Sequence, residues 1–469
     1  MANSKKHRSF AWNKFLKIFG TSTLAVAMAL TLTGCGTAPA ATAPNSLVIW
    51  GFVDEDVFNP IIKDFSAQNK DIDIKYVKKT LTSGYENDSL NSILSGQGPD
   101  VWAIPNDWVY RHKDKLAAAP NALLDNAKIK PTEYFIPSVV SDSIFDKQVY
   151  AMPPTTDVLQ IYYNPRIFEQ AQERAKNSAG DDEAKLEKIS TIFKNTPTTW
   201  EDFDALIPYL TVRNGANIQI AGAAIGTSNN ISYPADIFSL LMLQNQTKII
   251  SDDLSQSTLN LPIKNTTNAD VYAGKNALDF YTKYSNPTSP QYTWNSSMPI
   301  DIEAFAQGKV GIIFSYTNLT NYFAQIYPNF DYERSLVPQV GNLNPMVDYS
   351  RYTSYVVPQN STLPDTAWNF ILNLSTESAS TYQSSTKELS TKKPEENPTP
   401  VLKDRGVGEP PSENIVNSII TWNKGRYPVD VDLQFKDAIT RVNNHSQSSQ
   451  ASLDTAAANI TSLLRKSTW

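Results

Sequence analysis

Carboxylates stand close to aromatic rings in two short polar segments of this chain, WGFVDE and SYPAD. In the first segment, Asp54 or Glu55 could accept hydroxyl protons, and in the second Tyr233 and Asp236 could bind beside a ring. A flat ring packs against an apolar face of a ligand, and carboxylates pair with hydroxyls, since each buried hydroxyl left unpaired costs about 1–3 kcal/mol. These residues are candidates for binding a small solute. The alternative is that they cap helices or supply first-turn acids.

Residues that carry hydrolytic or metal chemistry are sparse in the sequence. The chain contains three histidines, His7, His112 and His445, which lie far apart, and neither a G-x-S-x-G nor an H-E-x-x-H motif. Asp and Glu total 47, so a surface glycosidase that uses two carboxylates stays open as an alternative. The sequence predicts no catalytic residue, no cofactor and no metal ligand.

Cys35 is the only cysteine of the chain, and it ends the tetrapeptide LTGC directly after an apolar run at 21–32. Five positive and no acidic residues precede that run, a pattern typical of a secretory signal. The tetrapeptide resembles a bacterial lipobox, whose cysteine is lipidated. We therefore expect a signal peptide at 1–34, a lipidated Cys35 and a flexible tether over 35–45. An ordinary signal with an incidental cysteine is the alternative.

The charge of the chain argues against nucleic acid as a partner. Removal of residues 1–34 would take away five positive charges and lower the formal charge from −6 to −11. Phosphate binding depends on clustered Lys and Arg, which an acidic chain does not favour.

The segments from residue 47 onward alternate between strand and helix patterns. Apolar runs predict strands at 47–50, 72–76 and 101–104, and helical spacing of apolar residues predicts helices at 57–65 and 90–94. Strands that alternate with helices of this length indicate an α/β fold with a parallel sheet and right-handed crossovers. About 435 residues would remain after removal of the signal, more than one core usually serves, so we expect two domains.

The middle of the chain contains a break that suggests a crossing between domains. Pro153 and Pro154 interrupt an extended apolar segment, which a continuous central strand would not tolerate. A second α/β region follows to about residue 300, with an exposed helical insertion at 169–195. Later apolar runs predict strands at 310–314 and 352–357 and a helix at 367–374.

Eight short motifs occur in a familiar order along the chain. They are LVIW at 47–50, GQGPDV at 96–101, KQVYAMP at 147–153, YYNP at 162–165, PTTWED at 197–202, FAQGKVG at 305–311, YVVP at 355–358 and AWNF at 367–370. Behind the lipobox-like segment, this order resembles family 1 extracellular solute-binding proteins, the sugar-binding components of ABC importers, and is similar to maltose-binding proteins. The resemblance covers nearly the whole chain after the signal.

The resemblance implies a two-lobe, periplasmic-binding-protein-like fold in which hinge strands cross between α/β lobes and the cleft between them holds the ligand. One lobe is expected to contain residues 46–153 and 301–347. The other is expected to contain 154–300 and 348–469. Clefts outside strand C-termini are where α/β sheets bind ligands.

The resemblance also implies which loops face the cleft. Family members often place rings and an acid just past the strand that follows the Pro-Asp pair, which points to Trp102, Asn106, Asp107 and Trp108. Core packing of one tryptophan is the alternative.

Further candidates come from the other crossings. Asp157 stands where maltose-type proteins carry an acid, and Tyr316, with Asn318 nearby, stands where relatives usually carry a tryptophan. Arg351 and Tyr352 lie on a later crossing. The smaller ring at Tyr316 leaves the identity of the sugar open.

Two tyrosines allow a metal hypothesis that the motifs disfavour. Tyr162 and Tyr163 could bind iron through their phenolates, but they are more simply part of the hinge-strand motif.

The function implied is ligand binding without catalysis on the outer face of the cell membrane. The expected partners are a solute, the permease subunits of an ABC transporter, and the membrane through the lipid on Cys35, with the chain itself a monomer. Oligosaccharide is the first choice of ligand because the loops are rich in rings, whereas a glycerol-phosphate compound, a polyamine or a peptide stays open. A surface-anchored carbohydrate-active enzyme and a ligand-binding partner of a sensor system are the alternative functions.

Overall fold

The structure, a computed structural model, describes residues 45–341, 346–394 and 413–466. The predicted signal segment 1–34 and Cys35 lie outside these residues, as does the predicted tether up to residue 44. Within the described ranges, no helix has both the length and the apolar character needed to span a bilayer.

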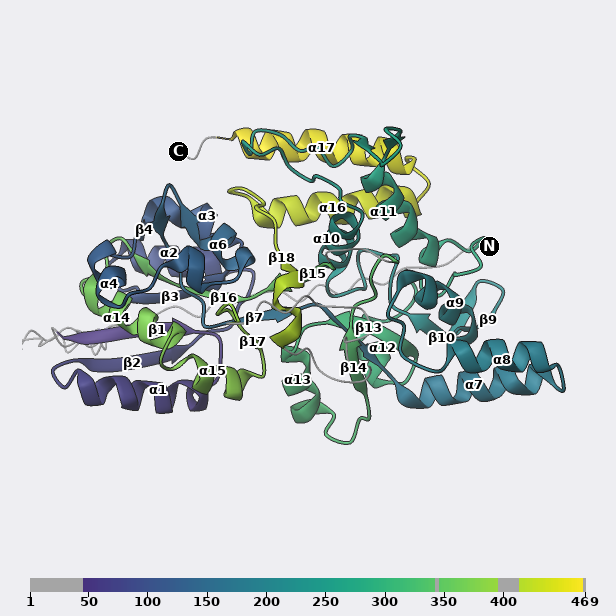
Figure 1. Cartoon of the computed structure of the whole chain (residues 1–469), viewed down its shortest axis with the longest axis horizontal. Coiled ribbons are helices and arrows are strands. Elements are labelled where there is room, and N and C mark those ends of the chain that lie inside the picture. Colours follow the sequence, from purple (N-terminus) through teal and green to yellow (C-terminus); the bar gives the residue numbers. More distant parts are fainter. Residues whose placement is uncertain (1–44, 342–345, 395–412, 467–469) are drawn as a thin grey trace, which may run out of the picture. The chain divides into compact units, whose positions relative to one another are not determined.

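The first sheet confirms the predicted parallel arrangement of the early strands. Its order is β2 (Asp73–Lys78), β1 (Ser46–Gly51), β3 (Val101–Pro105), β16 (Thr353–Pro358) and β4 (Leu116–Ala117). β1 pairs in parallel with β2 and β3, and β16 runs antiparallel to β3 and β4. Helices α1 (Glu55–Gln68), α2 (Tyr85–Leu94), α14 (Pro364–Ser375) and α15 (Ala379–Thr386) lie around this sheet (Figure 1).

The second sheet lies in the middle of the chain. Its order is β14 (Glu333–Leu336), β8 (Gln160–Tyr163), β13 (Val310–Ser315), β10 (Asn217–Ala223) and β9 (Val212–Asn214). β10 and β13 are parallel, so their carboxyl ends reach the same edge of the sheet. The helices of this part are α7 (Pro165–Ala179), α8 (Glu183–Ile192), α9 (Trp200–Leu210), α10 (Pro234–Gln244), α11 (Ala273–Thr282), α12 (Asp301–Ala306) and α13 (Asn318–Ile326).

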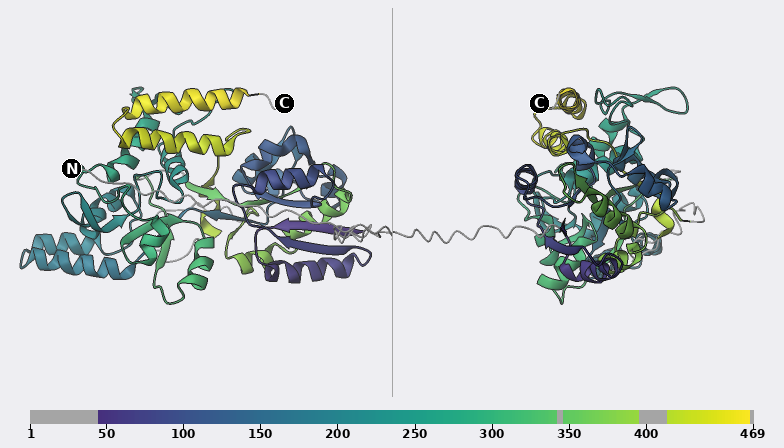
Figure 2. Two further views of the ribbon diagram at one scale, coloured as in Figure 1. Left: turned by 180° about the vertical axis from the view of Figure 1, so that it is seen from behind. Right: turned by 90° about the vertical axis from the view of Figure 1, so that its left-hand side faces the viewer.

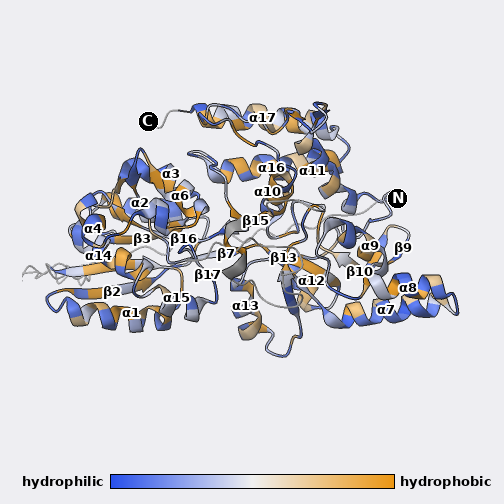
Figure 3. Cartoon of the chain, in the orientation of Figure 1, coloured by the Kyte–Doolittle hydropathy of each residue, from blue (hydrophilic) through white to orange (hydrophobic). Residues whose placement is uncertain are grey.

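Two helices from the end of the chain belong to the second sheet's core. α16 (Pro428–Asn443) and α17 (Ser449–Arg465) run side by side and pack on α10 and α11 (Figures 1 and 2). Their apolar residues join the same buried cluster as the second sheet, for example Phe435 and Ile460. In Figure 3 the hydrophilic colour covers much of α7 and α8, as expected for the predicted exposed insertion.

Apart from the strands of the third sheet described next, the other helices and strands are short. They are α3 (Trp108–His112), α4 (Asn121–Asn126), α5 (Pro131–Tyr134), α6 (Pro137–Ser143), β5 (Ile144–Phe145), β6 (Gln148–Val149), β11 (Ile263–Lys264) and β12 (Asp270–Val271).

A small third sheet carries the crossings between the two parts. Its order is β17 (Leu389–Ser390), β7 (Thr155–Val158), β15 (Asp348–Arg351) and β18 (Ile419–Ile420). β7 follows the Pro153–Pro154 break and leads into β8, β15 leads back into β16, and β18 leads by residues 421–427 into α16. Three of the four strands of this hinge sheet, β7, β15 and β18, thus lead from one part of the chain to the other.

The predicted lobe boundaries are wrong at two places. Residues 301–347 were assigned to the first lobe, but β13 pairs with β8 and β10, and β14 pairs with β8, in the second sheet. Residues from 348 onward were assigned to the second lobe, but β16 pairs with β3 in the first sheet. Strands β13 and β16 were found from their apolar runs, whereas their pairing partners lie more than 80 residues away, where local sequence carries no information.

Candidate functional site

Two loops at the carboxyl ends of β10 and β13 bring predicted site residues together. Tyr233 and Asp236 stand at the start of α10, and Tyr316 follows β13. The Tyr316 hydroxyl donates to Oδ2 of Asp236 over 2.9 Å, and the rings of Tyr233 and Tyr316 meet edge to face with centroids 5.0 Å apart. The parallel pairing of β10 and β13 explains why residues 80 positions apart meet here.

The loop before α10 is fixed by buried polar groups. The fully buried Asp301 accepts hydrogen bonds from the backbone N of Ser232 over 2.9 Å and from its hydroxyl over 2.6 Å. Pro234 at the first position of α10 favours helical backbone angles without losing a hydrogen bond. The ring of Tyr233 is therefore held at a defined place beside the helix start.

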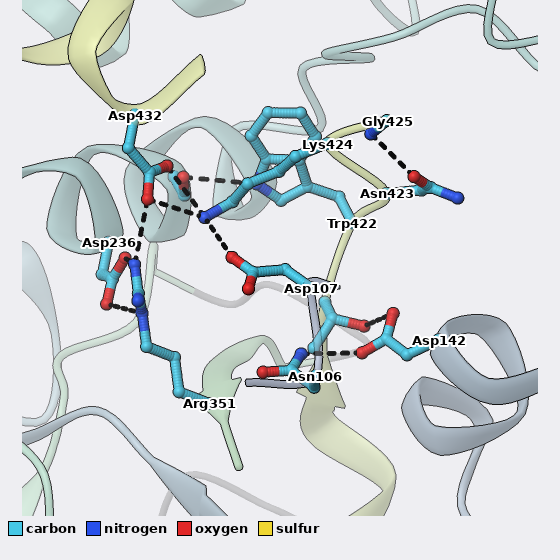
Figure 4. Close-up of polar contacts among 12 residues, drawn as sticks. Asn106, Asp107, Asp142, Asp236, Arg351, Trp422, Asn423, Lys424, Gly425 and Asp432 are labelled. Carbon is cyan, nitrogen blue, oxygen red and sulfur yellow. Dashed lines mark hydrogen bonds and ion pairs between the residues drawn. The ribbon is translucent and has the colours of Figure 1, made fainter. Parts of the chain in front are cut away.

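Arg351 of the hinge strand β15 joins this cluster through two carboxylates. Its Nε lies 2.5 Å and its Nη2 2.6 Å from the two oxygens of Asp236, and Nη2 also lies 3.1 Å from Oδ2 of Asp432 on α16 (Figure 4). Burial by itself lowers the pKa of Arg351, but the two carboxylates raise that pKa well above its ordinary value. The guanidinium is therefore a permanent cation at this point.

Lys424, in the connection between β18 and α16, extends the cluster toward the first sheet. Its side chain is 1% exposed, and Nζ lies 2.8 Å from Oδ1 of Asp432 and 3.4 Å from Oδ2 of Asp107. Asp107 stands in the loop between β3 and α3. Burial opposes the charge of Lys424, but Asp432 and Tyr349 raise its pKa, while Lys424 and Arg351 together lower the pKa of Asp432 despite its burial. Lys424, Asp432 and Arg351 are therefore all charged at neutral pH.

Two cavities adjoin this cluster, and Tyr233 lines both. The smaller, of about 220 Å³, is lined by Ser232, Tyr233, Pro234, Ala235, Asp236, Arg351, Val429, Asp432, Leu433 and Lys436. The larger, of about 380 Å³, is lined by Tyr233, Ile300, Ile302, Glu303, Ser315, Asn318, Leu319 and Tyr322. We call them the polar cavity and the apolar cavity. Their lining residues come from the second sheet's part of the chain and from the hinge strand β15.

Large apolar side chains stand exposed around these cavities. Ile300 and Tyr322 at the apolar cavity and Val429 and Leu433 at the polar cavity are between 42 and 56% exposed. Exposed apolar side chains that gather beside a cavity mark a ligand or partner surface more strongly than the same residues scattered singly.

Other predicted residues lie away from the two cavities. Trp102 is fully buried and packs in one cluster with Trp50 and Trp108, which favours the core-packing alternative for these rings. Asp54 is exposed and pairs with Lys78, and Glu55 is the exposed first residue of α1.

Three polar candidates hold the hinge. Asn106 donates to Oδ2 of Asp142 over 2.8 Å, and the Tyr352 hydroxyl donates to the same oxygen over 2.7 Å. Asp157 of β7 accepts from the backbone N and the hydroxyl of Thr317, each over 2.7 Å. Burial, followed by the nearby carboxylate of Glu388, raises the pKa of Asp157.

Three residues of the site were not predicted from the sequence: Lys424, Asp432 and Tyr322. Lys424 stands alone between Asn423 and Gly425, and Asp432 lies within an ordinary amphipathic helix, so neither shows a motif. Tyr322 follows Asn318 by four positions on α13, and this helical spacing is the one signal that could have placed it beside the predicted loop.

Both hydroxyls of the tyrosine pair of β8 are engaged in hydrogen bonds. The Tyr162 hydroxyl donates to the carbonyl oxygen of Tyr316 over 2.7 Å, and the Tyr163 hydroxyl donates to Glu333. In the described parts of the chain, no group of three or more His, Cys, Asp or Glu side chains is placed to hold a metal ion.

Known proteins resemble the chain in sequence and in fold. A family model described as bacterial extracellular solute-binding protein matches residues 60–404. A putative binding protein of Brucella abortus is 22% identical over 322 residues, which cover 67% of each chain. The structure is similar to the cyclic alpha-maltosyl-1,6-maltose binding protein of Arthrobacter globiformis, with a TM-score of 0.67, 18% identity and coverage of 90% of this chain and 100% of that one. It is also similar to an ABC substrate-binding protein of Listeria monocytogenes solved with cycloalternan, with a TM-score of 0.64, 15% identity and coverage of 89% and 98%. These likenesses confirm the predicted two-lobe α/β fold.

Proposed function

Because this chain belongs to the family of bacterial extracellular solute-binding proteins, we propose that it captures a sugar or oligosaccharide in the cavities on either side of Tyr233 and delivers it to the permease of an ABC importer. The observation that carries the proposal is the make-up of those cavities. Exposed apolar side chains stand beside carboxylates and cations that are already paired with one another.

The charge balance of the polar cavity favours a neutral ligand. Asp236 and Asp432 are offset by Arg351 and by Lys436, which lines the same cavity. The two carboxylates and the two cations that line this cavity leave it without net charge, and sugar hydroxyls can donate to the carboxylates and accept from the guanidinium.

The apolar cavity suits the faces of sugar rings. Tyr322 presents a ring that is 42% exposed, and Tyr233 stands between this cavity and the polar one. The two cavities together have room for more than one sugar unit, which favours an oligosaccharide. The relatives with similar structures support this ligand class, since their names give a maltosyl-maltose and a cycloalternan.

The proposed activity is binding and release without a chemical step. Asp236 and Asp432 are both held by Arg351, and Lys424 lowers the pKa of Asp432, so neither is prepared to act as a general acid. The ligand would instead shift the hinge toward a closed arrangement, which the permease reads. Release of smaller sugars from an oligosaccharide would overturn this part of the proposal.

We further propose that the protein is a monomer held at the outer face of the cell membrane by a lipid on Cys35. The lipobox-like sequence supports this anchor. Replacement Cys35→Ser in the producing cell should move the protein from the membrane fraction to the medium or periplasm, while ligand binding persists. A variant that stays in the membrane fraction would contradict the anchor.

The test of the ligand class is a thermal-shift and calorimetric panel on the purified protein. The panel contains maltotetraose, mannotriose, monosaccharides, glycerol phosphate, polyamines and amino acids. A ligand at 100 times its dissociation constant stabilises the folded state by about 2.7 kcal/mol, which a melting curve resolves. We expect the response from a sugar, and a response from polyamines or amino acids alone would overturn the proposed ligand class.

A further inference from the structure

One buried lysine bridges a carboxylate of the first sheet's part of the chain and a carboxylate of the second. Asp107 follows β3 of the first sheet, and Asp432 lies on α16, which packs in the second sheet's core. Lys424 stands between them at 3.4 Å and 2.8 Å, with almost no exposed surface (Figure 4). Asp432 is the nearer partner and compensates most of the charge of this buried ammonium, and Asp107 adds a second, weaker contact from the other part of the chain.

The same lysine is connected to the polar cavity through a continuous chain of ion pairs. Asp432, which holds Lys424, also lies 3.1 Å from Arg351, and Arg351 holds Asp236 at two points. Arg351, Asp236 and Asp432 all line the polar cavity. A ligand there would contact one end of a chain whose other end is Asp107, outside both cavities.

A second ion pair near Lys424 provides a natural comparison. Arg426, two residues further along the same connection, lies 2.6 Å from Asp114, which follows α3 in the first sheet's part. Neither Arg426 nor Asp114 lines the polar or the apolar cavity. This pair joins the same two parts of the chain but has no link to the ligand.

We propose that Lys424 is a positioning residue that couples occupation of the polar cavity to closure of the two lobes, through Asp432 on one side and Asp107 on the other. The inference rests on the proposed function and assigns a role within it. A bound ligand would replace water over Arg351 and Asp432, whose side chains are 37% and 17% exposed. Exclusion of water lowers the local dielectric and strengthens every pair in the chain, including the one that reaches Asp107. By linkage, the factor by which the ligand stabilises the Asp107–Lys424 contact equals the factor by which an intact contact increases the affinity for the ligand.

The experiment compares two variants of the chain of ion pairs with a matched control. Asp107→Asn removes the first-lobe end, Lys424→Met removes the centre, and Asp114→Asn removes the comparison pair. Dyes on Leu94→Cys and Tyr272→Cys, at exposed positions of the first and second parts, report the distance between lobes in a Cys35→Ser background. The probes are maltotetraose and mannotriose, with association and dissociation rates followed by stopped flow.

We expect both the sugar-induced change in dye distance and the dissociation rate of the sugar to be altered in the two variants that interrupt the series of ion pairs. Asp107→Asn and Lys424→Met should lose the sugar-induced shortening of the dye distance and raise the dissociation rate about tenfold, with the association rate changed less than about twofold. Asp114→Asn should keep the shortening and both rates. Where Lys424→Met fails to fold, Asp107→Asn carries the test, because it leaves the contact between Lys424 and Asp432 in place.

The outcomes separate this inference from the proposed function. Rates and shortening that match Asp114→Asn in both variants would overturn the role of Lys424 while the protein remains a sugar-binding protein. Failure of the unaltered protein to respond to any sugar would overturn the proposed function, and that result is visible without any variant. In that case the dye distances measured without ligand still test whether Lys424 connects the two lobes. A broader distance distribution in Asp107→Asn than in Asp114→Asn supports this role of Lys424, and equal distributions overturn it.

Discussion

The guanidinium of Arg351 meets the carboxylate of Asp236 at two points, with Nε 2.5 Å from Oδ2 and Nη2 2.6 Å from Oδ1. Arg351 ends the hinge strand β15, and Asp236 lies in the first turn of α10, so the pair ties a crossing segment to the helix that begins the proposed site. Two-point pairing fixes direction as well as distance. The same contact thus holds the hinge and shapes the polar cavity.

Replacement Asp236→Asn should lower the free energy of unfolding by about 2 kcal/mol. Removal of one partner from a buried pair costs about 3–5 kcal/mol, and the 37% exposure of the Arg351 side chain lets water recover part of that. Urea unfolding measures the change. The control is Asp252→Asn, in a pair with Lys248 whose carboxylate is 93% exposed, which should cost less than about 0.5 kcal/mol. Equal effects of the two variants would contradict the structural weight given to Arg351 and Asp236.

Replacement Tyr322→Ala should weaken sugar binding about 3- to 10-fold with little change in melting temperature. The ring is 42% exposed at the apolar cavity, so its loss removes a packing face for the ligand but little of the core. Titration calorimetry measures the affinity. Tyr272→Ala, at a ring with 44% exposure that lines neither cavity, should leave the affinity unchanged. Comparable losses in both variants would point to a site elsewhere.

Replacement Asp142→Asn should flatten the pH dependence of stability between about pH 4 and pH 6. Burial raises the pKa of Asp142 to about 6, although hydrogen bonds from Asn106, Tyr352 and Thr421 oppose the shift. The folded state therefore keeps a proton that the unfolded chain releases near pH 4. The contribution of Asp142 is fully present below pH 4 and is lost as the pH rises to 6, a fall of about 3 kcal/mol.

Urea unfolding of both proteins from pH 3.5 to pH 7 isolates this contribution. The variant itself should be less stable, since an amide can accept fewer of the three hydrogen bonds, but the difference between the two proteins should shrink as the pH rises. A constant difference over the whole range would mean that Asp142 keeps an ordinary pKa in the folded protein.

Replacement Gly274→Ala should lower the free energy of unfolding by about 1–3 kcal/mol, because it disturbs the core beside the second sheet. A Cβ atom at Gly274 on α11 would lie 2.1 Å from the backbone oxygen of Leu259, and backbone cannot move aside as a side chain can. Gly84→Ala is the control, because its Cβ would meet the side chains of Asp88 at 3.4 Å and Thr82 at 3.9 Å, both ordinary contact distances. A melting temperature equal to that of the control would show that α11 shifts easily.

Sequence periodicity was sufficient for the first strands and helices of this fold. The runs at 47–50, 72–76 and 101–104 became the parallel strands β1, β2 and β3, and helical spacing located α1 and α2. Burial of one face requires apolar residues at regular intervals within a contiguous segment, so each pattern is complete in the local sequence. Tyr233 and Asp236 were found as a ring and a carboxylate at the start of a predicted helix, and Tyr316 was found through the resemblance to solute-binding proteins.

Only the tertiary structure decided which strands share a sheet and which charges share a site. The sequence of residues 301–347 predicted a strand but not the strands with which it pairs. It also identified Trp102 and Trp108 as aromatic candidates but not whether their rings pack in a core. Lys424 meets Asp107, which lies 317 residues earlier in the chain, and Arg351 meets Asp236 across 115 residues. Ion pairs and strand pairs form between surfaces that the folded backbone brings together, and their spacing along the chain leaves no periodic trace. The sequence by itself therefore determined many of the elements and the class of fold, while the contacts that build the proposed site and link it to the hinge depend on the folded chain.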